Sequence, residues 1–205
     1  MNAAAVAPGH VDPLVESFAR EAAAAGAVVH GPASMDEAFA IVRDLVPESG
    51  PSTILAWEAA ALGTLDAWQR LGALGLTPIS PMLPPDTSER LSSLAALEAV
   101  AVGLTSAVGA LADTGTIVLA SGADRPRLAW LLPSRHVALV DTRIVSPDMD
   151  AFFRTSGFNR AASPDPSLPA HLAFVTGPSR TADIELTLTR GVHGPREVHL
   201  ILVVQ

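Results

Sequence analysis

A segment near the end of the chain carries residues suited to binding an anion. The apolar run 172–176 is followed by glycine, proline, serine, arginine and threonine at positions 177–181. Glycine lets a ligand approach the backbone, hydroxyl groups donate hydrogen bonds, and the forked guanidinium group suits phosphate or carboxylate. We therefore predict that Gly177, Ser179, Arg180 and Thr181 bind an anion. The alternative is a capped helix in which Arg180 pairs with a surface acid.

A second loop, at residues 191–196, precedes the last predicted strand and has the sequence GVHGPR. His193 could act as acid, base or hydrogen-bond donor, and Arg196 adds a cation. We predict that both residues neighbour the anion site, the alternative for His193 being a structural role. Because this loop leads into a strand, a parallel last strand would place it at the opposite sheet edge from Arg180. A folded-over loop or an antiparallel last strand would bring the two together.

Two carboxylates are candidates for catalysis. Asp113 begins the string DTGT before a predicted strand, where it serves either as a general base or as a turn residue, and the turn is favoured. Glu58 follows the predicted strand 52–57, the position of a glutamate nucleophile in covalent transferases, or it is an exposed carboxylate at a helix start. The six histidines are scattered without metal-ligand spacing, so no metal site is predicted.

Composition excludes several functions. The chain has no cysteine and no lysine, which rules out thiolate chemistry, thiolate-held iron–sulfur clusters and Schiff bases within it. A net charge of −8 argues against nucleic-acid binding. The most apolar stretch, Leu94–Leu104, is too short to span a membrane, and residues 1–8 lack the features of a signal peptide. We expect a cytoplasmic protein.

Short helices alternating with apolar strands predict a three-layer α/β/α fold. We expect one domain over residues 1–205, with 1–11 a flexible N-terminal segment, and a mostly parallel sheet of five to seven strands. Predicted helices begin at Pro13, with Asp12 as the N-cap, and at Ser34, with a capping box to Glu37; others cover 64–71, 87–100 and 147–154. Predicted strands cover 27–30, 52–57, 76–79, 101–107, 116–120, 136–140, 172–176 and 198–204.

Residues 182–189 combine two signals. Apolar and polar side chains alternate there, which is typical of a strand. Turn residues before the segment, Asp183 and Glu185 in a first turn, and Arg190-Gly191 at the end favour a helix instead. We predict a helix, whose N-terminal N–H groups would face the anion site.

The second half of the chain, and above all the strings TGPSRTADIE (176–185) and GVHGP (191–195), resembles the LUD-domain family of lactate-utilisation proteins, the protein C type. Asp113 stands where that family more usually has glutamate. The resemblance implies a domain like those of the sugar-phosphate isomerase and CoA-transferase superfamily. It also implies a role in oxidising L-lactate to pyruvate.

The resemblance further implies two iron–sulfur partner proteins, which would hold the clusters. This chain would then bind a small anionic ligand or serve in assembly of the complex. The alternative is a stand-alone enzyme acting on an anionic substrate. It would resemble an isomerase, a CoA transferase or formyltetrahydrofolate cyclo-ligase.

The first prediction concerns redox cofactors. Purified alone, the protein should be colourless, because it has no thiolate to hold an iron–sulfur cluster. Visible absorbance and iron analysis after chelation measure this. Stoichiometric iron with cluster absorbance would contradict it.

Overall fold

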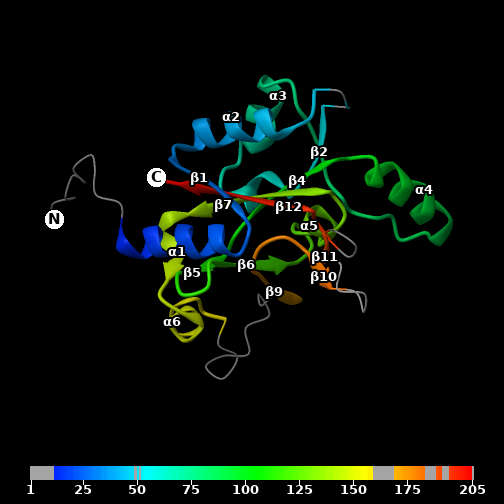
Figure 1. The fold of residues 1–205 in the computed structure, drawn as a ribbon. Coiled ribbons are helices and arrows are strands. Elements are labelled where there is room, and N and C mark those ends of the chain that lie inside the picture. The colour runs from blue at the N-terminus through cyan, green and yellow to red at the C-terminus, as the bar shows by residue number, and fades with distance from the viewer. Residues whose placement is uncertain are drawn as a thin grey trace.

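A six-stranded parallel sheet forms the centre of the computed structural model, in the order β1-β12-β7-β4-β2-β3 (Figure 1). The model describes residues 12–48, 50, 52–158, 169–182, 188–190 and 194–204, so the predicted flexible segment 1–11 lies outside the described residues. The strands are β1 (Val28–Ala33), β2 (Thr53–Ala56), β3 (Thr77–Ile79), β4 (Val102–Ser106), β7 (Arg135–Asp141) and β12 (Glu197–Val203).

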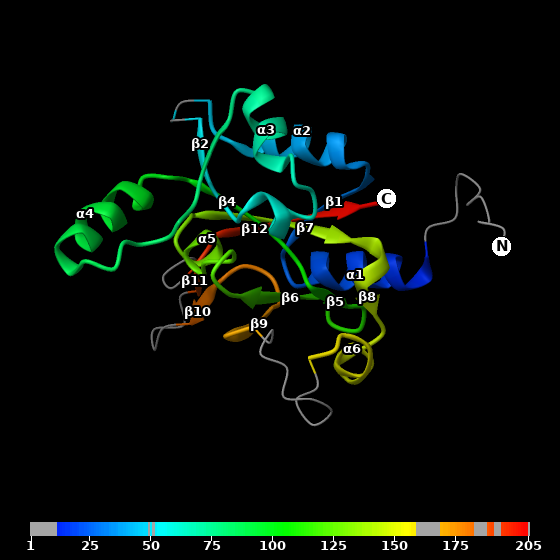
Figure 2. The same ribbon diagram turned by 180° about the vertical axis from the view of Figure 1, so that it is seen from behind.

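Helices and a second sheet cover the two faces of this sheet. The helices α2 (Met35–Leu45) and α3 (Ala67–Ala73) lie on one face, and α1 (Pro13–Ala24) and α5 (Leu128–Leu131) lie on the other, as Figures 1 and 2 show. The helix α4 (Thr87–Glu98) projects from the side, and α6 (Met149–Thr155) lies beyond the second sheet. The predicted α/β class and parallel sheet are confirmed. No described helix is long and apolar enough to cross a membrane.

The first two helices begin where their capping residues predict. The Asp12 carboxylate accepts a hydrogen bond from the backbone N–H of Leu14, and Ser34 with Glu37 completes the capping box. One apolar face of each helix is buried, with Phe18 and Phe39 fully enclosed. These helices therefore dock against the sheet as their periodicity predicts.

The second sheet was not predicted. It has the order β8-β5-β6-β9, formed by β5 (Gly109–Leu111), β6 (Thr116–Ser121), β8 (Val145–Ser146) and β9 (His171–Val175). Two strands predicted from their apolar runs, 116–120 and 172–176, pair with each other antiparallel in this sheet. A continuous apolar run predicts a buried strand but does not specify its partner.

The prediction of a helix over residues 182–189 is wrong at both ends of the segment, which are the parts that the structure describes. Its first residue lies in β10 (Arg180–Ala182), which pairs antiparallel with β11 (Leu188–Arg190); residues 183–187 lie outside the described residues. The alternation of apolar and polar residues was the better signal here. The turn at Gly177-Pro178 leads into a hairpin strand, so the anion site has no helix N-terminus behind it.

Other boundaries shift by a few residues. A 3₁₀ turn, η1 (Ala59–Leu62), precedes α3, which starts later than predicted. A second one, η2 (Thr142–Ile144), joins β7 to β8. Helix ends of this kind depend on tertiary packing more than on sequence pattern.

The contact between β4 and α5 gives a stability prediction. A Cβ atom at Gly103 would lie 1.8 Å from the backbone oxygen of Ala129, so Gly103→Ala should destabilise the protein by about 1–3 kcal/mol or more. Gly72→Ala is the matched control: it lies in α3 with nothing within 4 Å of its added Cβ, and should be neutral or slightly stabilising. Urea unfolding measures both. Equal stability of the two variants would contradict the close contact.

Candidate functional site

The two loops predicted to bind an anion meet in the structure. The backbone N–H of Ser179 donates a hydrogen bond to the carbonyl of Pro195 at 3.1 Å. A Cβ atom at Gly194 would lie 3.3 Å from the Ser179 side chain. The contact arises because β9 belongs to the second sheet, so its end reaches the amino end of β12. The expectation that a parallel last strand would keep the loops apart is therefore wrong.

A cavity of about 290 Å³ opens beside this contact. One wall is the strand end and loop 173–177 with Ser179, and another is Gly194, Pro195 and Val198. The remaining wall comes from Trp130 and Leu131 of α5 and from His136 of β7. The cavity thus joins both predicted loops to His136, which is not among the predicted binding residues.

His136 is the ionisable side chain that defines the chemistry of this cavity. Its ring nitrogen Nε2 lies 2.8 Å from the Thr105 hydroxyl oxygen, and burial lowers its pKa to about 3. It is therefore a neutral imidazole at pH 7, able to donate or accept a hydrogen bond. The sequence signal for His136 was its place at the start of the predicted strand 136–140, directly after Arg135.

Tertiary contacts hold the Gly177 end of the cavity in place. Gly177 has a φ of +76°, and an added Cβ would lie 2.4 Å from the backbone oxygen of Ala25 just after α1. The neighbouring Thr176 hydroxyl lies 2.7 Å from the hydroxyl of Thr116, which starts β6. Glycine at 177 is thus explained by backbone conformation and helix packing, whether or not a ligand approaches it.

The other predicted binding residues are placed differently. The backbones of Arg180 and Thr181 lie in β10, whereas the structure does not describe their side chains. His193 lies outside the described residues. Arg196 is exposed and lines a neighbouring hollow beside Glu98; its backbone N–H bonds the Ser134 carbonyl. The structure therefore joins Gly177 and Ser179 to the second loop, and sets Arg196 next to the His136 cavity.

The two candidate carboxylates lie away from this cavity. Asp113 is exposed in the turn between β5 and β6, where its backbone N–H bonds the Pro147 carbonyl, which fits the turn interpretation. Glu58 precedes η1 at the carboxyl end of β2, and its N–H bonds the Asp124 carbonyl. Among the described residues, no group of three or more metal-ligating side chains comes together.

A chain of charged and polar groups runs across the opposite face of the sheet. The His30 and His199 rings approach to 3.0 Å between ring nitrogens, and His199 lies 3.3 Å from the Glu197 carboxylate. That carboxylate accepts a hydrogen bond of 2.6 Å from Arg135. Burial lowers the pKa of both histidines, and the Arg135 hydrogen bond lowers the pKa of Glu197.

Comparison with known proteins identifies the family. The LUD domain model matches residues 15–203. The chain belongs to the LUD-domain family. It is 39% identical over 102 residues to "Lactate utilization protein C" of Halalkalibacterium halodurans, covering 50% of this chain and 44% of that protein. It is 34% identical over 124 residues to the protein of the same name from Bacillus subtilis, covering 60% and 51%. The LUD chain thus spans about half the length of these curated relatives.

A solved structure has the same fold. The crystal structure of a DUF162 family protein from Deinococcus radiodurans aligns with a TM-score of 0.59 at 21% identity. The alignment covers 94% of this LUD chain and 96% of that chain. At this identity the likeness supports the fold alone.

The depressed pKa of His136 predicts a pH-dependent stability. Its folded-state pKa of about 3 lies below the ordinary 6.5, so the unfolded chain binds more protons and stability falls as pH drops from 6.5 towards 3. The slope from this histidine alone is about 1.4 kcal/mol per pH unit. His30 and His199 add to it in the same direction.

The variant His136→Gln should reduce that slope, as measured by urea unfolding at a series of pH values. His171→Gln, at an exposed histidine in β9, is the control and should leave the slope unchanged. An identical slope in His136→Gln and the unmodified protein would contradict a buried neutral imidazole.

Proposed function

We propose that this LUD-domain chain takes part in lactate utilisation as a ligand-binding or assembly component beside iron–sulfur proteins. The family match and the relatives named "Lactate utilization protein C" support the pathway. The absence of cysteine supports a division of labour, because any thiolate-held cluster must belong to another protein. On this proposal the protein works in the cytoplasm, with two iron–sulfur proteins as partners and no cluster of its own.

The observation that carries the ligand-binding role is the contact between the two family-like strings at the His136 cavity. The Ser179 hydroxyl offers a hydrogen-bond donor, and the neutral His136 lines the same cavity without adding charge. On this proposal Arg180, Thr181 and His193 complete the site with side chains, and Arg196 draws anions towards its rim. A small anion of modest charge is the ligand that fits.

Growth on lactate tests the proposal. Deleting the gene in the source organism should abolish or slow growth on L-lactate and leave growth on glucose unchanged. Complementation by the unmodified gene should restore growth, and Arg180→Ala should restore it poorly because a charge-assisted hydrogen bond contributes about 1.5–3 kcal/mol.

Arg20→Ala is the control for Arg180→Ala, because Arg20 is an exposed residue of α1 paired with Glu21. A tagged protein should also retain iron–sulfur proteins from lactate-grown cells. Normal growth of the deletion strain on lactate, with a strictly solitary tagged protein, would refute the proposal.

A second candidate function, an enzyme acting on an anionic substrate, is favoured by the neutral buried histidine in the cavity. A neutral imidazole can donate a hydrogen bond that polarises a substrate carbonyl, as in isomerases. A CoA transferase or a cyclo-ligase would use other groups, and Glu58 is the carboxylate placed for a covalent step. Mass spectrometry after incubation with acyl-CoA separates the two candidates: a thioester adduct lost in Glu58→Gln would favour the transferase.

A further inference from the structure

A second cavity, of about 230 Å³, lies at the opposite edge of the main sheet from the His136 cavity. Ser106, Asp141 and Val203, the last residues of β4, β7 and β12, line it together with η1 and the first residue of α2. Because the six strands are parallel, their carboxyl ends meet at this edge. From β2 the chain continues to the edge strand β3, whereas from β4 it continues to β7 in the opposite direction across the sheet. Crevices at such a reversal are where open α/β sheets bind ligands.

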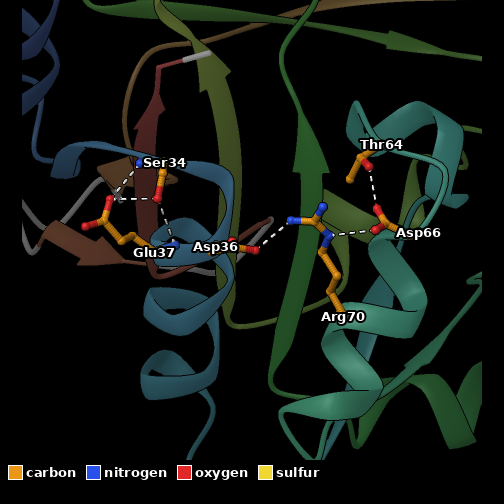
Figure 3. A network of polar contacts seen from close by, with 6 residues as sticks. All are labelled: Ser34, Asp36, Glu37, Thr64, Asp66 and Arg70. Carbon is orange, nitrogen blue, oxygen red and sulfur yellow. Dashed lines mark hydrogen bonds and ion pairs between the residues drawn. The ribbon is translucent and has the colours of Figure 1, made fainter.

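The walls of this cavity are fixed by polar contacts, which Figure 3 shows. Arg70 of α3 bonds Asp36 of α2 at 2.6 Å and Asp66 at 2.9 Å, and Asp66 accepts a hydrogen bond from Thr64. These contacts tie the first turn of α2 to the segment that follows η1. The Ser106 hydroxyl also donates to the Ala61 carbonyl, which ties η1 to the end of β4. These contacts therefore hold α2, η1 and the end of β4 in place around the cavity.

Arg125 supplies the positive charge of this cavity. The backbone of Arg125 is held in a tight turn by reciprocal hydrogen bonds with Gly122, and the indole N–H of Trp57 bonds the next carbonyl, that of Pro126. The Arg125 Nε atom is buried and has no hydrogen-bond partner among the described residues. It lies 3.7 Å from the Asp124 carboxylate, an ion-pair distance without a hydrogen bond. A buried donor of this kind is normally satisfied, by protein, water or ligand.

The remaining lining decides which anion fits. Most of it is apolar, including Leu62, Val108 and Leu139. Burial raises the pKa of Asp141, but hydrogen bonds from Arg143 outweigh it and keep the pKa below its ordinary value. Asp141 is thus an ionised carboxylate beside the cavity, which disfavours a doubly charged ligand. The volume is below the about 300–1,000 Å³ of drug-sized ligand sites.

We propose that this cavity binds a small monocarboxylate, with Arg125 pairing to the carboxylate and the apolar wall holding a short carbon chain. The site is distinct from the His136 cavity and does not rest on the proposed role in lactate utilisation. A guanidinium fork matches the two oxygens of a carboxylate, and the ionised Asp141 in the lining disfavours a second negative charge on the ligand.

Ligand-observed NMR titration of the purified chain with propionate tests the proposal. Propionate should bind saturably, and both propionamide and phosphate should bind at least about tenfold more weakly, since the first lacks the charge and the second carries too much. Arg125→Met should weaken propionate binding by about the same factor. Ala60→Phe should weaken it too, because Ala60 is an exposed residue that lines the cavity, and a larger side chain there fills the opening.

Arg20→Met is the matched control, because Arg20 is an exposed residue of α1 paired with Glu21 and lines neither cavity. It should leave propionate binding unchanged. Should Arg125→Met fail to fold in a thermal melt, Ala60→Phe decides the outcome. Absence of saturable binding overturns the proposal, as does equal binding of propionamide or phosphate. Propionate binding that survives in the folded Arg125 and Ala60 variants, or is lost in Arg20→Met, also overturns it.

Discussion

The insertion of β12 between β1 and β7 is the pairing on which the rest of the structure depends. Seven residues of β12 pair with seven of β7, and β1 pairs along its other side. From Val198 to Val203 every residue is buried. The strand β12 therefore lies inside the sheet, second from its edge, and among the described strands the edge strand β1 pairs with it alone. Both cavities include residues of β12 or of the loop that leads into it.

The second sheet gives the protein its unusual site at the amino edge. In a simple three-layer α/β fold, loops at that edge connect helices back to strands and seldom gather at one point. Here the chain leaves the second sheet after β9, and Gly177 and Ser179 then lie beside the loop that precedes β12. The resulting cavity has a floor formed by the main sheet, where His136 is cut off from solvent and stays neutral.

The two edges of the sheet thus carry different chemistry. The amino edge offers the Ser179 hydroxyl and a neutral imidazole, whereas the carboxyl edge offers a positioned guanidinium group against an apolar wall. Electrostatics at the carboxyl edge are set by two ion pairs, between Arg125 and Asp124 and between Arg143 and Asp141.

Much of the fold and half of the candidate site were predictable from the sequence. Capping residues located the starts of α1 and α2, and apolar runs located most strands, because these signals act within a few residues. The strings around Ser179 and Gly194 were predicted as binding loops from their glycine, hydroxyl and arginine content alone. Local chemistry was sufficient for each of these.

What the tertiary structure decided was which local pieces meet. No periodicity assigns Thr116–Ser121 to a second sheet, since strand partners are chosen by packing across the whole chain. Their residue types alone did not set His136 and Arg125 apart, and only burial beneath α5 and the turn at Gly122 gave them distinct environments. Residues Arg180–Ala182 form a strand because a partner at Leu188–Arg190 is available to satisfy their backbone. Residue type is local, whereas burial and pairing are properties of the folded chain.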